Sequence, residues 1–256
     1  MDRTWDRPIA HRGLHGRGTP ENSLPAIAAA RRLGLGIEID VRVTADGVAV
    51  VHHDVDLMRM CSTPGRVADL TCSQVTAQRL TGTEHSVPTL GAALDLIGGD
   101  VPVLIDCKVR PTSRDRIRML RAVMHEVRAY QGPVGVVSFD PWFLARVMQH
   151  APGVVRGQSA GVALREARIP HQLRRATAPL DTFWFNHVSQ PHFLNYNIER
   201  LPQPVLGQLR DRGMKVMGWT VRHPEQLAAS AHLVDNVIAE GDAMDLLLRR
   251  PEALAG

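Results

Sequence analysis

The chain has 256 residues, enough for one domain with a large core, and its 44% hydrophobic and 22% charged residues exclude a disordered or fibrous protein. Its 30 basic and 26 acidic side chains give a formal charge of +4 without a dense basic run, and only 4% of residues are aromatic, which argues against nucleic-acid binding. No segment has the length of a membrane span, and the N-terminal stretch lacks the apolar core of a signal peptide, so we expect a cytoplasmic chain with three reduced cysteines.

Strand-like segments alternate with helix-like segments along the chain, which is the order of a parallel α/β fold. We predict eight strands, over residues 8–13, 36–41, 101–108, 133–140, 154–160, 183–189, 215–221 and 236–240. Helices are predicted over residues 88–98, 114–130, 141–150, 203–212 and 223–231, and over 22–34 with Asn22 as N-cap and Gly34 just beyond the end.

Eight strands with intervening helices in a chain of this length predict a (β/α)8 TIM barrel, formed as a single domain over residues 1–256. A doubly wound sheet is the alternative, but no G-x-G-x-x-G loop follows any predicted strand.

Residues 42–87 interrupt this alternation. A short strand returns from the turn at Asp46 and Gly47, and residues 55–87 contain turn residues and little helical periodicity. We therefore expect an insertion after the second strand that projects over the mouth of the barrel.

Polar side chains gather where the predicted strands end, which is where barrels of this kind place their active sites. In GIEIDVRVTADGVAVVHHD, residues 36–54, the carboxylates of Glu38 and Asp40 are two residues apart and share one face of a strand. Together with Asp106 at the end of the third strand, they could bind a hard cation such as Mg²⁺ or Ca²⁺. Alternatively, the carboxylates could pair with arginines or with Lys108.

Two histidines and an arginine accompany these carboxylates. His11 and His53 suit acid-base chemistry near neutral pH, although a single histidine is more often a hydrogen-bonded structural residue. Arg12 offers a planar fork for a phosphate oxygen, or an ion pair with one of the carboxylates.

The motifs occur in a recognisable order. Residues 10–54 contain HRG, PEN, an E-x-D strand, a T-x-DG turn and a terminal HD, and PTL (88–90), LIDCK (104–108), SF (138–139) and GWTV (218–221) follow. This order resembles the glycerophosphodiester phosphodiesterase family. The resemblance implies a (β/α)8 barrel with a small insertion after strand two, and the metal-dependent hydrolysis of a small phosphodiester to glycerol phosphate and an alcohol.

The resemblance also implies roles for individual residues of these motifs. The divalent cation would be held by Glu38, Asp40 and Asp106, and His11 and His53 would be the acid-base pair. We assign His11 as base and His53 as acid, although the sequence alone does not decide between the two. Substrate would be contacted by Arg12, Glu21, Lys108 and Trp219, although Glu21 and Trp219 could equally serve packing. Asp106 stands where the family has Glu, and Glu240 where it often has Asp, which leaves the identity of the substrate open.

Three functions are compatible with this pattern. The leading one is hydrolysis of water-soluble glycerophosphodiesters, and the others are a lysophospholipase D acting on amphiphiles and a catalytically silent barrel that binds phosphodiesters. The presence of both histidines argues against the silent barrel, because binding alone needs no proton-transfer pair. The sequence does not distinguish attack by water from attack by a glycerol hydroxyl through a cyclic phosphate, nor does it give the oligomeric state.

Overall fold

The computed structural model describes residues 3–161, 183 and 185–249. Contacts within the chain define two compact units, residues 2–136 and residues 137–256, and the expectation of a single domain stays a prediction. The three cysteines are free thiols, as expected. Among the helices of the described residues, none combines the length and the apolar character needed to cross a bilayer.

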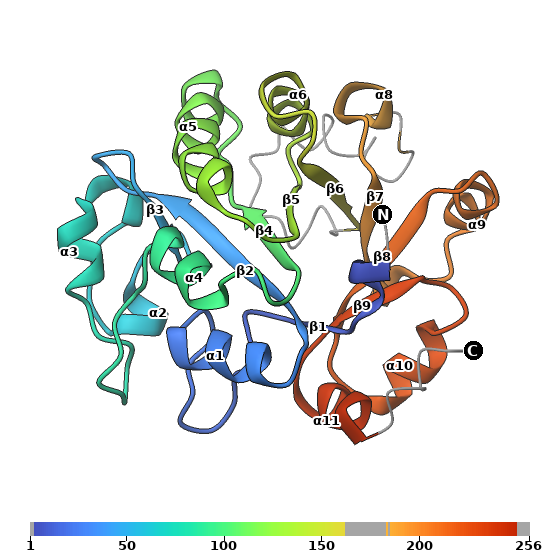
Figure 1. The fold of residues 1–256 in the computed structure, drawn as a ribbon, viewed down its shortest axis with the longest axis horizontal. Coiled ribbons are helices and arrows are strands. Elements are labelled where there is room, and N and C mark those ends of the chain that lie inside the picture. Colours follow the sequence, from blue (N-terminus) through green and yellow to red (C-terminus); the bar gives the residue numbers. More distant parts are fainter. Residues whose placement is uncertain (1–2, 162–182, 184, 250–256) are drawn as a thin grey trace. The chain divides into compact units, whose positions relative to one another are not determined.

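The N-terminal unit is built around one long strand. In chain order its elements are η1 (Arg3–Asp6), β1 (Ile9–Ala10), α1 (Leu24–Arg32), β2 (Gly36–Val43), β3 (Ala49–Val51), α2 (Met58–Cys61), η2 (Val67–Asp69), α3 (Cys72–Thr76), α4 (Leu90–Ile97), β4 (Val103–Cys107) and α5 (Ser113–Ala129). Strand β2 pairs in parallel with β1 and β4, and its C-terminal end pairs antiparallel with β3. Helix α4 packs between α1 and α5, and both of these outer helices contact β2 (Figure 1).

The ends of α1 follow from its sequence. The Ser23 hydroxyl accepts a hydrogen bond from the Ala26 amide, Pro25 lies in the first turn, and Gly34 leaves the helix at a φ of +69°. Glycine is suited to that position because it has no Cβ to oppose a left-handed backbone. The N-cap predicted at Asn22 is wrong by one residue, because the Asn22 backbone is itself left-handed and its side chain turns toward β2.

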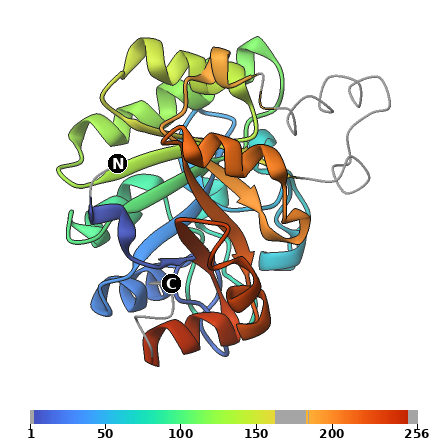
Figure 2. The same ribbon diagram turned by 90° about the vertical axis from the view of Figure 1, so that its right-hand side faces the viewer.

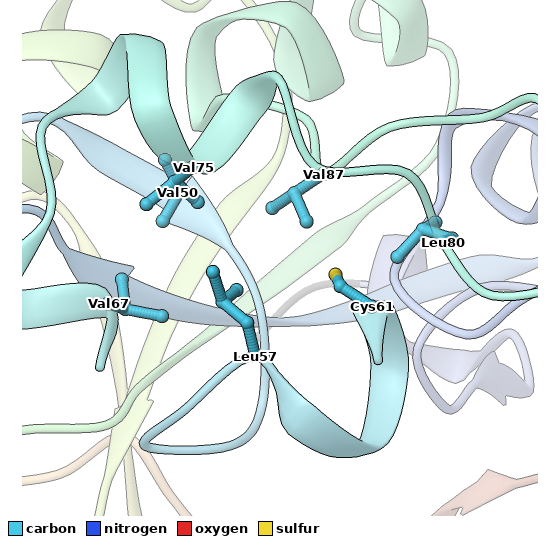
Figure 3. Close-up of a cluster of buried hydrophobic side chains, with 7 residues drawn as sticks. All are labelled: Val50, Leu57, Cys61, Val67, Val75, Leu80 and Val87. Carbon is cyan, nitrogen blue, oxygen red and sulfur yellow. The ribbon is translucent and has the colours of Figure 1, made fainter. Parts of the chain in front are cut away.

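The insertion after β2 has a small apolar core of its own. Its buried side chains are Val50, Leu57, Cys61, Val67, Val75, Leu80 and Val87 (Figure 3). Helices α2 and α3 are four and five residues long, too short to display a helical period in the sequence. Helix α3 begins with a capping box in which Thr71 and Gln74 bond each other's backbone amides.

The C-terminal unit continues the alternation of strands and helices. Its elements are α6 (Pro141–His150), β6 (Val155–Ala160), α8 (Asn186–Ser189), β7 (Phe193–Asn197), η4 (Ile198–Arg200), α9 (Pro204–Asp211), β8 (Lys215–Val221), α10 (Pro224–Ser230), β9 (Asn236–Ala239) and α11 (Gly241–Arg249), while β5 (Val134–Ser138) spans the boundary. Strands β6, β7, β8 and β9 pair in parallel, each with the next along the chain. Helices α10 and α11 lie side by side (Figures 1 and 2).

The nine strands of the described residues belong to one sheet, and eight of them form the parallel (β/α)8 barrel while β3 lies outside it. The predicted fold class is therefore confirmed. The strand predicted over residues 183–189 is wrong: Asn186–Ser189 is helix α8, residue 184 lies outside the described residues, and the strand is Phe193–Asn197 instead. Two asparagines lower the strand propensity of that segment, but Phe193 and Tyr196 are fully buried, and tertiary packing overrides the propensity.

Two glycines of the C-terminal unit give opposite expectations for an added methyl group. A Cβ on Gly157 in β6 would overlap Cζ of the buried Phe193 and lie 2.7 Å from Cγ1 of Val137. We expect Gly157→Ala to lower the free energy of unfolding by roughly 1–3 kcal/mol through overpacking. The exposed Gly207 in α9 has no neighbour within 4 Å of such a Cβ, so Gly207→Ala should raise stability by about 0.5–1 kcal/mol. Urea denaturation of both variants measures the difference, and equal effects would contradict the close approach of β6 and β7.

Candidate active site

Three carboxylates meet where β2 and β4 run side by side. The parallel register sets Asp40 opposite Asp106, and Glu38 shares the face of Asp40 two residues earlier. All three are buried, with exposed fractions of 3% for Glu38, 1% for Asp40 and 7% for Asp106. One oxygen from each carboxylate lies within 4.8 Å of the others. The predicted metal ligands therefore lie together.

Asp40 is held by two cations and an amide. Its Oδ1 lies 2.8 Å from Nζ of Lys108, and its Oδ2 lies 3.0 Å from Nε of Arg12. Asn22 donates from Nδ2 to Oδ2 over 2.8 Å and accepts a 3.0 Å hydrogen bond from the Asp40 amide. Burial alone would raise the pKa of Asp40, but the charges of Lys108 and Arg12 outweigh burial and hold it far below its usual range.

The remaining charges do not balance. Lys108 donates to Oδ2 of Asp106 over 2.6 Å, and the carboxylates of Asp106 and Asp40 raise its pKa against the effect of burial. Glu38 accepts a 3.0 Å hydrogen bond from the Arg12 amide, and Nε2 of His11 lies 4.0 Å from the same oxygen. Burial, and then the charge of Asp40, raise the pKa of Glu38 well above its ordinary value. Two cations thus face three carboxylates. The negative charge left without a partner is expressed as the raised pKa of Glu38.

These residues fit a hard divalent cation. Oδ1 of Asp106 is buried and accepts no hydrogen bond from any described residue, which leaves an oxygen available to a ligand. Carboxylate oxygens are the donors that Mg²⁺ and Ca²⁺ prefer, and a cation would relieve the repulsion that raises the pKa of Glu38.

His53 is oriented by Asp54, a carboxylate to which the sequence pattern alone assigned no role. Its Nδ1 lies 2.7 Å from Oδ1 of Asp54, and Arg59 donates from Nε to the other oxygen of Asp54 over 2.5 Å. Burial raises the pKa of Asp54, but the hydrogen bonds from Arg59 and His53 outweigh burial and lower it to about 2. Burial lowers the pKa of His53, so its imidazole is neutral down to a lower pH than in a free histidine.

Arg59 also reaches Glu21. It donates from Nη2 to Oε1 over 2.7 Å and from Nη1 to Oε2 over 3.1 Å, and Arg12 donates to Oε1 from Nη1 over 2.8 Å. Glu21 therefore lies between Arg12 and Arg59, and α2 of the insertion is tied to the loop after β1. The motifs PEN and HD each contain an acidic residue that an arginine could pair with. The sequence did not identify Arg59 as the partner of both.

Other residues have local roles. His52 is buried, its Nε2 lies 2.9 Å from the Asp56 carbonyl oxygen, and burial lowers its pKa, which fits a structural imidazole of the insertion. In the C-terminal unit, Trp219 donates from Nε1 to the Asn195 carbonyl over 3.0 Å and packs edge-to-face on Phe139.

The same unit holds Glu240, which accepts a 2.7 Å hydrogen bond from Nε of Arg222.

A family model described as the glycerophosphoryl diester phosphodiesterase family matches residues 11–249. The chain belongs to this family. It is accordingly a phosphoric diester hydrolase. A glycerophosphodiester phosphodiesterase of Caldanaerobacter subterraneus is 28% identical over 91% of the chain and 93% of its own length.

Solved structures share the fold. A phosphodiesterase of Oleispira antarctica matches with a TM-score of 0.78 at 19% identity, over 98% of this chain and 97% of its own. A glycerophosphodiester phosphodiesterase of Thermotoga maritima matches with a TM-score of 0.72 at 23% identity, over 94% of this chain and 96% of its own.

The role of Asn22 can be isolated because its backbone is left-handed, with a φ of +56°. Asn22→Gly keeps that conformation and deletes only the side chain, so it should cost roughly 1–3 kcal/mol of unfolding free energy by leaving polar groups of the buried Asp40 unbonded. Asn22→Ala should cost about 1–2 kcal/mol more, because alanine opposes the left-handed backbone. Chemical denaturation measures both changes. A fully stable Asn22→Gly would show that Asp40 does not need the amide.

Proposed function

We propose that this chain hydrolyses glycerophosphodiesters to glycerol phosphate and an alcohol, using a divalent cation and the histidines His11 and His53. The observation that carries the proposal is the convergence of three buried carboxylates, one of which has an unbonded oxygen. The phosphodiesterase of Oleispira antarctica was solved in complex with its product sn-glycerol-3-phosphate, which supports a product of this class here.

In this proposal Glu38, Asp40 and Asp106 hold the cation. When bound, it supplies positive charge beside the phosphoryl oxygens, where charge develops in the transition state. Arg12 and Lys108 are already fixed by Asp40, so they present positive charge to the substrate without losing much side-chain freedom on binding. Preorganised charge of this kind needs no rearrangement when the phosphoryl group arrives.

The hydrogen bond to Asp54 assigns the proton-exchanging atom of His53. In the neutral tautomer that donates from Nδ1 to Asp54, the lone pair is on Nε2, which is then the atom that accepts a proton. Because burial lowers the pKa of His53, the resting histidine is neutral near pH 7, and we assign it as the base. His11, beside Glu38, then protonates the departing alkoxide. This assignment is the reverse of the one made from the sequence.

Glu21 and Arg59 are proposed as positioning residues. Both oxygens of Glu21 accept hydrogen bonds from arginine, so the carboxylate holds Arg12 in place and is less available to a substrate hydroxyl. Arg59 fixes Asp54 and, through it, the ring of His53.

The metal site makes a first prediction. Excess EDTA should abolish hydrolysis and lower the melting temperature, because a cation that binds only the folded state stabilises it. Asp106→Asn should weaken cation affinity by about tenfold or more, because it removes a charge at unchanged size. Asp106→Glu should retain much of the affinity, since it keeps the charge.

Calorimetric titration of Mg²⁺, Ca²⁺ or Mn²⁺ into these variants is the measurement. Asp95→Asn, on the exposed side of α4, is the matched control and should bind the cation like the wild type. Equal affinity in wild type and Asp106→Asn would remove Asp106 from the ligand set and leave it as the partner of Lys108.

The histidine assignment makes a second prediction. If neutral His53 accepts the proton, kcat/KM falls as the pH drops through its lowered pKa, so the midpoint of the acidic limb should lie below about 6.5. His53→Ala should lose that limb and roughly 10²–10⁴ in turnover. The exposed His85 of the insertion provides the control, and His85→Ala should keep both the limb and the rate. An acidic limb centred above pH 7 that persists in His53→Ala would overturn the base assignment.

A further inference from the structure

A second feature of the N-terminal unit is a hollow beside Lys108 that the proposed hydrolysis does not use. Its cavity volume is about 40 Å³, room for several water-sized groups, and a single water needs about 10–15 Å³. Apolar side chains form almost half of the lining of the hollow, and its charged residues are Arg42, Arg66, Lys108, Arg110, Asp115 and Arg118. The wall therefore contains five cationic side chains and one carboxylate.

The charge of this wall is compensated only in part. Lys108 is ion-paired with Asp40 and Asp106, and the charges of Asp40 and Asp54 act on Arg42 from outside ion-pair distance. Arg118 donates from Nη2 to the carbonyl oxygens of Thr44 and Ala45, and Arg42 donates from Nε to the carbonyl oxygen of His53. Carbonyl groups fix a guanidinium but carry no formal charge, so both arginines keep theirs. Among the described residues, neither of them has a carboxylate within ion-pair distance.

The outer arginines are also available. Arg66 is exposed and forms no ion pair with any described residue, and Nε of Arg110 is 3.8 Å from Oδ2 of Asp115, with about half of its side chain exposed. Guanidinium groups with unused donors bind phosphate and carboxylate in a bidentate fashion. The hollow thus has the chemistry of an anion site.

Lys108 connects the hollow to two of the three carboxylates. Its Nζ bonds Asp40 and Asp106, while its side chain also lines the hollow. Arg66 and Arg110 come instead from the insertion and from the segment after β4, outside the strands that carry the carboxylates. A substrate whose scissile phosphate lies at Lys108 can therefore present a second group to these arginines.

We propose that the hollow binds a second anionic group of the substrate, so that the preferred glycerophosphodiesters carry a further phosphate on the alcohol portion. The inference rests on the proposed function and specifies its substrate class. A cationic alcohol such as choline would meet a wall of like charge, which disfavours it. The preference should weaken as ionic strength rises, because the outer arginines are exposed to solvent.

The test compares two substrates that differ by one phosphate, glycerophosphoinositol and glycerophosphoinositol 4-phosphate, with glycerophosphocholine as the cationic reference. Wild type should show a kcat/KM about tenfold higher for the phosphorylated compound, mostly through KM, as expected for one charge-assisted contact. Dissociation constants measured in EDTA, where the proposed hydrolysis does not proceed, should show the same order.

The variant Arg66→Gln/Arg110→Gln should lose most of this discrimination while keeping its rate on glycerophosphoinositol and its melting temperature. Arg32→Gln, an exposed arginine of α1 away from the hollow, is the matched control and should keep the discrimination. Titration of inorganic phosphate separates a site for a free anion from one for a substrate group.

The outcomes separate the two proposals. Hydrolysis of both inositol compounds at equal kcat/KM and equal affinity would overturn the second anionic group and leave the proposed function intact. Tight, variant-sensitive binding of inorganic phosphate without discrimination between the substrates would overturn it in favour of a free-anion site. Failure to hydrolyse any of the three compounds, with affinity still higher for the phosphorylated one, would overturn the proposed function and support the anion site.

Discussion

A carboxylate buried at 1% exposure must find compensating charge and hydrogen bonds, and the need of Asp40 for both sets the arrangement around it. Lys108 comes from the end of β4, and Arg12 and Asn22 come from the two ends of the loop between β1 and α1, so two segments converge on one side chain. The backbone adapts to this demand. Asn22 takes a left-handed conformation to reach Asp40, and the capping of α1 passes to Ser23. The same contacts that permit burial also fix the two cations proposed to meet the substrate.

The sequence predicted the barrel because its strongest signals are local and repeated. Alternation on β2 places Glu38 and Asp40 on one face, and the long periodic helix over Ser113–Ala129 was predicted within one residue at each end. The prediction failed where packing outweighs local preference. Strand β7 contains two asparagines and was missed, but Asn195 donates from Nδ2 to the Ser159 hydroxyl of the neighbouring strand, which gives the amino group of this buried amide a partner in the sheet interior. Helix α11 was not predicted either.

The part of the candidate site that lies at the C-terminal ends of strands was predictable, because parallel strands bring these ends to one edge of the sheet. This is why Glu38, Asp40 and Asp106 were identified together. The supporting residues were harder to find. Asn22 resembled an ordinary helix cap, and Arg59 is 38 residues from its partner Glu21, so no local period connects them. Which carboxylate has the raised pKa could not be predicted either, since that depends on burial and on the distances to two cations.

The insertion combines an apolar core of its own with one arginine that reaches Glu21 and Asp54. Some of its exposed side chains, Met58 among them, belong to neither arrangement, whereas Val55 and Arg66 line the hollow beside Lys108. A protein engineer can therefore randomise these surface positions as a small library without disturbing the buried valines or the arginine. The insertion offers a module for redirecting substrate choice, provided that His53 and Asp54 are kept unchanged.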